Sequence, residues 1–135
     1  MSYTFGLTHM SAFVNATPHA VTIAGVTFPA SGTPLRLTNA PAPVIGTLNL
    51  DSNTKVDVVG EPKYIGLEPD TLPDPLPKVL IVSSLVGEYL SKYPQIFPGV
   101  TVVAPDTSPG FVIRDKAGGI TGTKRFVAYR LNKDT

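Results

Sequence analysis

The most evident absence in this sequence is cysteine, and tryptophan is missing as well. Without cysteine the chain has no disulfide framework, no thiolate ligand for a metal and no cysteine nucleophile. Histidine is almost as scarce, because His9 and His19 are the only two. Neither histidine stands three or four residues from a carboxylate on an expected helix, which is the spacing that favours a metal site. We therefore expect neither a metal nor a cofactor.

Charge is also sparse. Charged residues make up 16% of the chain, and 11 basic residues against 10 acidic ones leave a net charge of +1. Such a balance excludes both the highly charged disordered class and a strongly basic protein that binds nucleic acid through its overall charge. Specific binding to nucleic acid is therefore not expected.

Long apolar runs are absent too. No segment approaches the roughly 20 apolar residues that a membrane-spanning helix requires, and residues 1–16 contain neither a basic start nor an apolar stretch of signal-peptide length. We expect a soluble protein that does not interact with membranes and that stays in the compartment where it is made.

Glycine and proline, in contrast, are plentiful, with 12 and 14 copies in 135 residues. This frequency of chain-breaking residues excludes a helical bundle or a coiled coil. Hydrophobic residues make up 42% of the chain, which is enough for one compact core. The expected organisation is an N-terminal extension over residues 1–12 followed by a single β-rich domain over residues 13–135.

Short runs of β-branched residues separated by turn residues predict strands and hairpins. One hairpin is expected where Gly25 separates residues 20–24 from residues 26–28. A second is expected where Asp51, Ser52 and Asn53 separate residues 44–50 from residues 56–59. Further strands are expected at the following places: residues 35–37, 79–82, 100–103, 111–114, 120–122 and 126–131.

One segment has the pattern of a helix, at about residues 84–93. Its apolar residues recur at helical spacing, Ser83 and Ser84 are suitable N-caps, and Pro94 ends it. Gly87 in its middle is either a position of close packing or an accident. Together these patterns predict a mainly β fold of the α+β type. It is expected to be an antiparallel sheet or a small β-barrel built from hairpins, with one packed helix.

Motifs that carry chemistry are weak. The glycines at 118, 119 and 122 lie in an expected hairpin and precede no helix, so they form no phosphate-binding loop. A Ser-His-Asp set can be assembled from Ser83 or Ser84, His19 and Asp106, but no nucleophile elbow surrounds either serine. Capping of the helix is the competing interpretation of the two serines.

Positive charge is concentrated at the C-terminal end. Residues 111–135 contain six basic and two acidic residues, so the rest of the chain is net negative. Arg114, Arg125 and Arg130 fall on or beside neighbouring expected strands, where their guanidinium groups would converge on one anion. The alternative is an edge strand that its charges protect from aggregation. If an anion binds, the helix N-terminus near Ser83 and Ser84 is a second place for phosphate.

Four sequence blocks support a resemblance to a known family. They are NATPHAVTI from Asn15, IVSSLV from Ile81, VVAPDTSP from Val102 and RDKAGGITGTKRF from Arg114. In this order and spacing they resemble a widespread family of small uncharacterised proteins of tailed bacteriophages and some bacteria. The resemblance implies a phage or prophage origin. It also implies special importance for the recurring positions, which are Thr17, Pro18, His19, Ser83, Pro105, Asp106, Thr107, Arg114, Asp115 and Gly119.

Three functions follow as hypotheses. The first is a non-enzymatic phage-encoded binding module, similar in outline to the sponge proteins that sequester nucleotide signals of host defence. Its expected ligand-binding residues are Arg114, Arg125, Arg130, Asp106, Thr107, Ser83, Ser84 and His19. The second is a structural virion protein, such as a capsid decoration or adaptor protein that contacts the major capsid protein. The third is a small hydrolase that uses His19 and Asp106.

Location and assembly follow from these hypotheses. The binding module would act in the cytoplasm of an infected bacterium, and the structural protein would reside in the virion. A β-rich chain with several hairpins has sheet edges to cover, so we also expect a homo-oligomer, either a dimer or a multiple of dimers.

Overall fold

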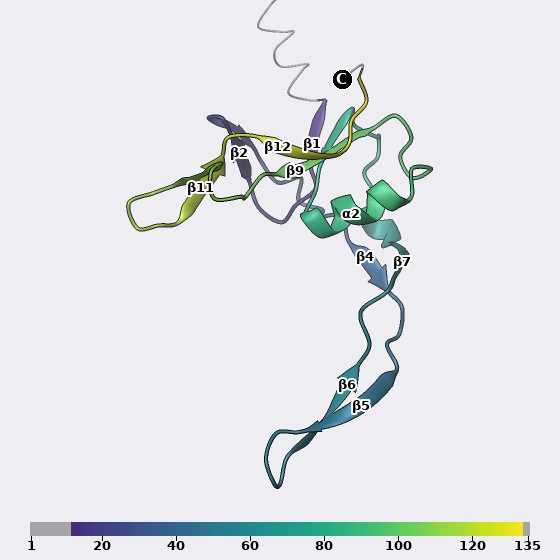
Figure 1. The fold of residues 1–135 in the computed structure, drawn as a ribbon. Coiled ribbons are helices and arrows are strands. Elements are labelled where there is room, and N and C mark those ends of the chain that lie inside the picture. Colours follow the sequence, from purple (N-terminus) through teal and green to yellow (C-terminus); the bar gives the residue numbers. More distant parts are fainter. Residues whose placement is uncertain (1–11, 134–135) are drawn as a thin grey trace, which may run out of the picture.

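The computed structural model describes residues 12–133 as a β-rich body with one helix and a long projecting hairpin (Figure 1). Of the N-terminal extension expected over residues 1–12, only Ala12 lies within the described residues. The body contains two four-stranded sheets, and the projection contains two small two-stranded sheets.

The first sheet forms the centre of the body. Its strand order is β1-β8-β9-β12, with bounds Phe13–Asn15, Val79–Ile81, Thr101–Pro105 and Phe126–Arg130. β8 pairs in parallel with both β1 and β9, while β12 is antiparallel to β9. β8 is buried along its whole length and β9 along all but its last residue, as is typical of parallel strands covered on both faces.

The second sheet carries two of the hairpins that the sequence predicts. Its order is β10-β11-β2-β3, with bounds Val112–Arg114, Ile120–Thr123, Val21–Ile23 and Val26–Phe28. The reversal between β2 and β3 places Ala24 and Gly25 at φ values of 49° and 84°. Positive φ at both central residues fits the tight turn that matches the twist of the flanking strands.

Helix α2 (Ser84–Lys92) connects the parallel strands β8 and β9 and packs against β12 and β9. Its buried side contains Val86, Gly87 and Leu90. A Cβ atom placed on Gly87 would lie 2.3 Å from the Tyr129 ring, so only glycine lets the helix approach the sheet this closely. Gly87 is therefore a position of close packing.

The projection, which we call the arm, consists of residues 37–67 and extends away from the body (Figure 1). Its base is the pair β4 (Leu37–Asn39) and β7 (Tyr64–Leu67), and its outer part is the pair β5 (Val44–Asn49) and β6 (Lys55–Val59). Asp51 organises the turn at the tip, where its Oδ1 accepts a hydrogen bond of 2.8 Å from the Asn53 N–H group. The chain returns to the body through the 3-10 turn η1 (Pro69–Thr71).

The hydrophobic core divides between the two faces of the central sheet. One cluster lies under helix α2 and includes Leu80, Val82, Leu90 and Val102, all fully buried. The other lies between the two four-stranded sheets and includes Ile81 and Phe28. These clusters hold the body together and involve none of the residues of β5 and β6.

The prediction of a mainly β fold with one packed helix is confirmed, and the hairpins expected around residues 25, 51–53 and 115–119 all form. The helix ends one residue earlier than expected. The small-barrel alternative is wrong, because the sheets of the described residues are open. The parallel pairs of β8 were not predicted, since a short apolar run does not reveal its partner or its direction.

Candidate functional site

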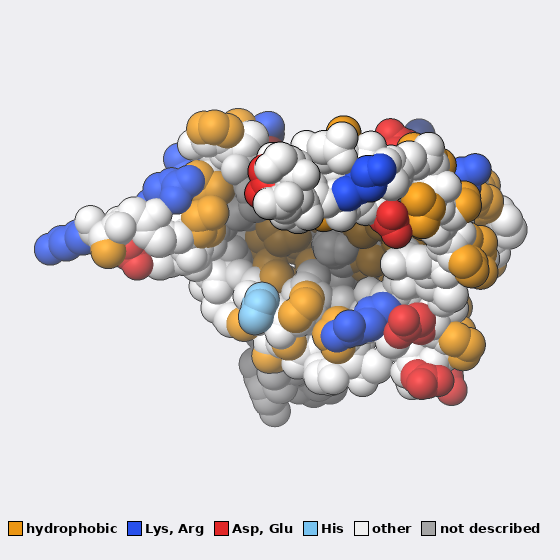
Figure 2. All heavy atoms as spheres, turned by 90° about the horizontal axis from the view of Figure 1, so that it is seen from below, with side chains coloured by type: hydrophobic (Ala, Val, Ile, Leu, Met, Phe, Trp, Pro, Cys, Tyr) orange, Lys and Arg blue, Asp and Glu red, His pale blue; other side chains and the backbone are white. Residues whose placement is uncertain are grey.

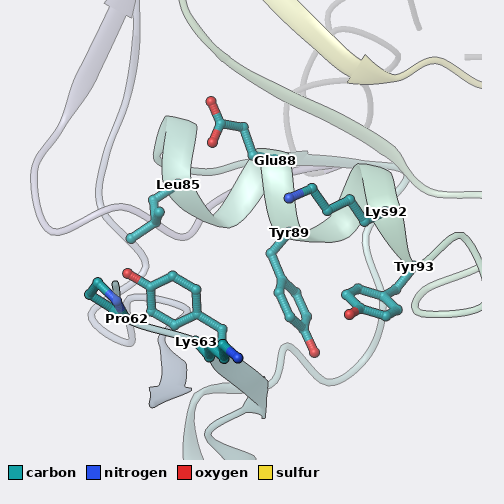
Figure 3. Close-up of a pocket in the computed structure, with 8 residues that line it drawn as sticks. Pro62, Lys63, Leu85, Glu88, Tyr89, Lys92 and Tyr93 are labelled. Carbon is teal, nitrogen blue, oxygen red and sulfur yellow. The ribbon is translucent and has the colours of Figure 1, made fainter. Parts of the chain in front are cut away.

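One concave site among the described residues is a groove between helix α2 and the base of the arm (Figure 3). Its volume is about 400 Å³. The residues that line it are Pro62, Lys63, Tyr64, Leu85, Glu88, Tyr89, Lys92 and Tyr93. Ligand pockets typically measure about 300–1,000 Å³, so the groove has room for a small molecule.

The helix side of the groove follows from how α2 packs. Because Val86, Gly87 and Leu90 face the body, the residues one turn apart at Leu85, Glu88, Tyr89 and Lys92 line the groove instead. The helix start is held by Ser83, whose Oγ accepts a hydrogen bond of 3.4 Å from the Val86 N–H group. The prediction that the serine pair caps the helix is thus confirmed for Ser83, while Ser84 is the first helical residue.

The arm side of the groove follows from the β4–β7 pair. Tyr64 is the first residue of β7 and pairs with Asn39 of β4. Directly beside it, the Lys63 carbonyl accepts a hydrogen bond of 2.7 Å from the Ala40 N–H group. These backbone contacts fix Lys63 and Tyr64 opposite the helix, so the site exists only where arm and body meet.

Aromatic rings dominate the groove. The rings of Tyr89 and Tyr93 are in contact, with centroids 4.7 Å apart and planes tilted by 39°. Tyr93 is 39% exposed, and Tyr64 and Tyr89 are half-buried, so each ring keeps part of its surface accessible. Such rings offer a planar ligand a surface for stacking.

Two cations line the groove at different places, and Figure 3 shows the Lys92 ammonium group on the same side of the helix as the Glu88 carboxylate and away from Lys63. Lys63 comes from the arm and Lys92 from the last turn of the helix. Figure 3 shows that the Glu88 carboxylate points away from Lys63 and from the Tyr89 hydroxyl. The end of the groove near Lys63 and Tyr89 therefore presents an ammonium group and a phenolic hydroxyl without a facing carboxylate, a combination that favours an anion.

Two of the C-terminal basic residues, Arg114 and Lys116, lie on a second projection, the hairpin of β10 and β11, where Figure 2 shows Lys and Arg side chains. Arg114 lies at the end of β10, and its guanidinium donates a 2.7 Å hydrogen bond to the Gly118 carbonyl in the turn of the same hairpin. Arg114 therefore closes its own turn.

Arg125 and Asp106 form an ion pair, and they contact Phe111 and Ser108. The Arg125 Nε atom lies 2.7 Å from Asp106 Oδ2, and the guanidinium stacks over the Phe111 ring at 3.3 Å from its centroid. The other carboxylate oxygen accepts hydrogen bonds from the Ser108 N–H and hydroxyl groups at 3.0 and 2.6 Å. Thr107 is exposed in the turn that these bonds create.

Arg130 has a different role, at the far end of helix α2. Its guanidinium donates to four backbone carbonyls, at distances of 2.6–3.3 Å, and these belong to Leu90, Tyr93, Ile96 and Phe97. Arg114, Arg125 and Arg130 thus each bond to different protein groups, and the structure does not bring them together around one point through these contacts.

His19 lies exposed in the turn before β2. Its carbonyl accepts hydrogen bonds from the Asn15 amide and the Thr17 hydroxyl, both at 2.9 Å. Asn15 is buried and also donates to the Phe28 carbonyl at 2.9 Å. Sequence reasoning singled out the Thr-Pro-His segment but missed Asn15, the residue that holds it in place.

Ionisation of Asp106 is expected to make the stability of the fold depend on pH in the acid range. Hydrogen bonds from Ser108, followed by the bond and charge of Arg125, lower the pKa of Asp106 from the usual 3.8 to about 2. A carboxyl group whose pKa is lower in the folded state stabilises the fold above its unfolded pKa, and this contribution is lost as pH falls through the folded pKa. The melting temperature should therefore fall between about pH 4 and pH 2.

This dependence is measured by thermal unfolding across that range. Asp106→Asn should melt at a lower temperature near neutral pH and should lose part of the acid-dependent slope, whereas Asp70→Asn, at an exposed site, should change neither. An unaltered slope in Asp106→Asn would contradict the assigned role of the ion pair.

Other kinds of site are not evident in residues 12–133. They contain no group of three or more side chains of the types that could hold a metal ion. None of their helices is long and apolar enough to cross a membrane. Comparison of the chain with known protein families, with curated proteins and with solved structures finds no match.

Proposed function

We propose that this protein is a non-enzymatic binding module whose groove holds a small anionic ligand with an aromatic ring, of the class of phosphorylated nucleotides. The observation that carries the proposal is that three tyrosines and two lysines line one groove of about 400 Å³. Under this proposal the ligand lies at the helix and the base of the arm rather than at the C-terminal arginines.

The chemistry of the lining matches the two parts of such a ligand. Stacking of a base on an aromatic side chain contributes roughly 1–3 kcal/mol. Tyr89 and Tyr93 form a paired aromatic surface for the base, and Lys63 with the Tyr89 hydroxyl suits a phosphate group. The two contributions together give affinity for a nucleotide and discriminate against ligands that lack either part.

The same lining argues for binding without reaction. It contains no histidine, serine or aspartate. Its one carboxylate, Glu88, is directed away from Lys63 and the Tyr89 hydroxyl (Figure 3). General acid–base chemistry needs a proton acceptor within hydrogen-bond reach of the reacting group. The ligand should therefore be recovered unchanged after binding.

The proposed biological role builds on the sequence resemblance. In a phage-encoded protein, tight binding without turnover would sequester a nucleotide signal of host defence in the cytoplasm of an infected bacterium. The helix is capped at both ends, by Ser83 and by Arg130, so its face of the groove is held before the ligand arrives. A preorganised surface loses less entropy on binding.

Isothermal titration with a panel of cyclic and ADP-ribose-type nucleotides tests the proposal. At least one nucleotide should bind, and Lys63→Ala and Lys92→Ala should each weaken its binding about tenfold, equivalent to roughly 1.4 kcal/mol. Lys116→Ala, at the exposed turn of the basic hairpin, is the matched control and should bind like the unaltered protein.

Two outcomes would contradict this proposal. One is the absence of measurable heat with every nucleotide of the panel. The other is weakening by Arg114→Ala or Arg125→Ala while the two groove variants bind normally, which would move the site to the basic hairpin.

A structural virion protein is the second candidate, and the arm is the observation that favours it. Every residue of β5 is exposed, as are all but one of β6, and such extended hairpins suit contacts between the subunits of an assembly. Mass spectrometry of purified particles should then detect the protein at high copy number. Its absence from the particles would exclude this candidate.

A further inference from the structure

The outer part of the arm is an isolated two-stranded hairpin with an uncovered apolar face. Leu48 and Val56 are directly opposite each other and are 59% and 37% exposed. Residues directly opposite in a hairpin share a face, and the alternation puts the next pairs, Thr47 with Asp57 and Asn49 with Lys55, on the other face. Between the turn and the irregularity at Val44 and Gly46, the outer arm therefore has one apolar face and one polar face.

A hairpin of this kind is at best marginally stable alone in water. β5 and β6 pair only with each other among the described residues, so β6 keeps an open edge. Contiguous exposed apolar side chains and open strand edges both mark places where another chain can bind or pair with the strand. Leu50, which lies two residues beyond Leu48 and is 64% exposed, extends the apolar surface along the arm.

The hydrogen-bond pattern shows which groups of β6 face its open edge. The Leu50 N–H group donates to the Thr54 carbonyl at 2.8 Å, which sets the alternation for the hairpin. In an antiparallel pair the residues that bond to the partner strand alternate with residues whose N–H and C=O groups point the other way. Val56 therefore faces β5, and Lys55 and Asp57 direct their backbone groups outward.

We propose that β6 pairs with β6 of a second copy of this chain, antiparallel, about a two-fold axis at Val56. In this register Lys55 of each chain lies opposite Asp57 of the other, and the two residues exchange the outward-pointing backbone hydrogen bonds. The sequence Lys-Val-Asp of residues 55–57 is thus self-complementary in charge under a two-fold axis. A two-fold axis at Lys55 or at Asp57 would instead oppose like charges.

The same register joins the apolar faces. Val56 of one chain lies opposite Val56 of the other, and Val58 lies opposite Thr54, all on the face that carries Leu48. The result is a four-stranded antiparallel sheet with one continuous apolar face and one charge-balanced polar face. Because the arm projects from the body (Figure 1), antiparallel pairing leaves the two bodies at opposite ends.

This pairing names the partner as a second copy and does not depend on the groove. Its test uses charge exchange in the full chain, with mass and dissociation constant measured by analytical ultracentrifugation. The unaltered protein should be a dimer or an assembly of several dimers. Lys55→Asp and Asp57→Lys should each raise the dissociation constant on the order of tenfold to a hundredfold, because each places like charges opposite each other twice.

Two experiments restore opposite charges across the two-fold axis, and they distinguish the effect of this register from a general loss of folding. The double variant Lys55→Asp/Asp57→Lys should dimerise like the unaltered protein. An equimolar mixture of the two single variants should form a heterodimer, because each then presents the charges that the other lacks. Within one hairpin the partners of Lys55 and Asp57 are the uncharged Asn49 and Thr47, so neither exchange opposes a like charge across the hairpin itself.

Lys116→Asp makes the same charge change as Lys55→Asp but on the hairpin of β10 and β11. It should leave the mass of the assembly in solution unchanged. The proposal is overturned if the unaltered protein is a monomer, or if its oligomer responds equally to Lys55→Asp, the double variant and Lys116→Asp. Failure of the mixed single variants to associate, while both remain folded by circular dichroism, would overturn it as well. Binding of a different protein to the arm of a monomeric chain would also contradict it.

Discussion

Arg130→Ala should lower the free energy of unfolding by about 3 kcal/mol, because it removes four hydrogen bonds that hold the end of helix α2 and the loop after it. A hydrogen bond to a charged group contributes roughly 1.5–3 kcal/mol, and water replaces part of this at the exposed end of the site. The loop includes Phe97 at a φ of 52°, a conformation that non-glycine residues rarely adopt. Arg130 thus holds an unfavourable backbone conformation in place.

Chemical denaturation measures this effect, and the conservative variant makes the mechanism specific. Arg130→Lys keeps the charge but loses the planar fork that reaches several carbonyls at once, so it should recover less than half of the loss. Arg114→Ala, which removes one bond in an exposed turn, should cost about 0.5 kcal/mol or less. Equal stability of Arg130→Ala and Arg114→Ala would be inconsistent with the capping role.

Asn15→Asp should destabilise the protein by about 3 kcal/mol at neutral pH, although only one atom of the side chain changes. The Asn15 amide nitrogen donates at 2.9 Å to both the His19 and the Phe28 carbonyl, and the residue is 3% exposed. An aspartate would keep the hydrogen bonds that the Thr17 N–H and hydroxyl groups donate to Asn15 Oδ1 at 3.0 and 2.6 Å. Its other carboxylate oxygen would face two carbonyl oxygens in a buried place, and a buried charge with only part of its hydrogen bonds is costly.

The pH dependence distinguishes this mechanism from a simple loss of packing. Burial among acceptors should raise the pKa of the introduced carboxyl, so the variant should recover stability relative to the unaltered protein as the pH falls and the group is protonated. Asn15→Ala should show no such recovery. Asn39→Asp, at an exposed position, should stay within about 0.5 kcal/mol of the unaltered protein. An Asn15→Asp variant with normal stability would contradict the network.

The local elements could be predicted from the sequence because their signals are local. The Ala-Gly reversal before β3, the Asp-Ser-Asn turn of the arm and the Gly-Gly turn of the basic hairpin each require particular residues at particular positions, and all three form. Ser83 and Pro94 likewise delimit the helix. The same kind of local signal marks the Asp106–Ser108 turn, which lies between the strands expected at residues 100–103 and 111–114.

The long-range arrangement could not be predicted. The parallel pairing of β8 with β1 and β9 depends on which buried strands meet, and apolar runs such as residues 79–82 are equally compatible with several partners. For the same reason the partners of the arginines were not foreseen. Arg130 and the carbonyl of Leu90 are 40 residues apart in the chain.

The groove was missed because its residues come from two segments with no shared motif. Tyr89 and Tyr93 belong to the apolar pattern that predicts the helix, and Lys63 and Tyr64 fall in a segment for which no strand is expected. The only available signal was the spacing of Leu85, Glu88, Tyr89 and Lys92 along one side of the helix, which marks a face but not what lies opposite it. A site of this kind becomes visible only once the fold is known.

Binding of an anionic aromatic ligand between helix α2 and the base of the arm is tested most directly by NMR titration of the isotopically labelled full chain with the tightest-binding nucleotide. We expect the largest chemical-shift changes in residues 62–64 and 85–93, including the Tyr89 and Tyr93 rings, and little change in the backbone of residues 111–125. Shifts concentrated in residues 111–125, or no shifts at all at saturating nucleotide, would contradict it.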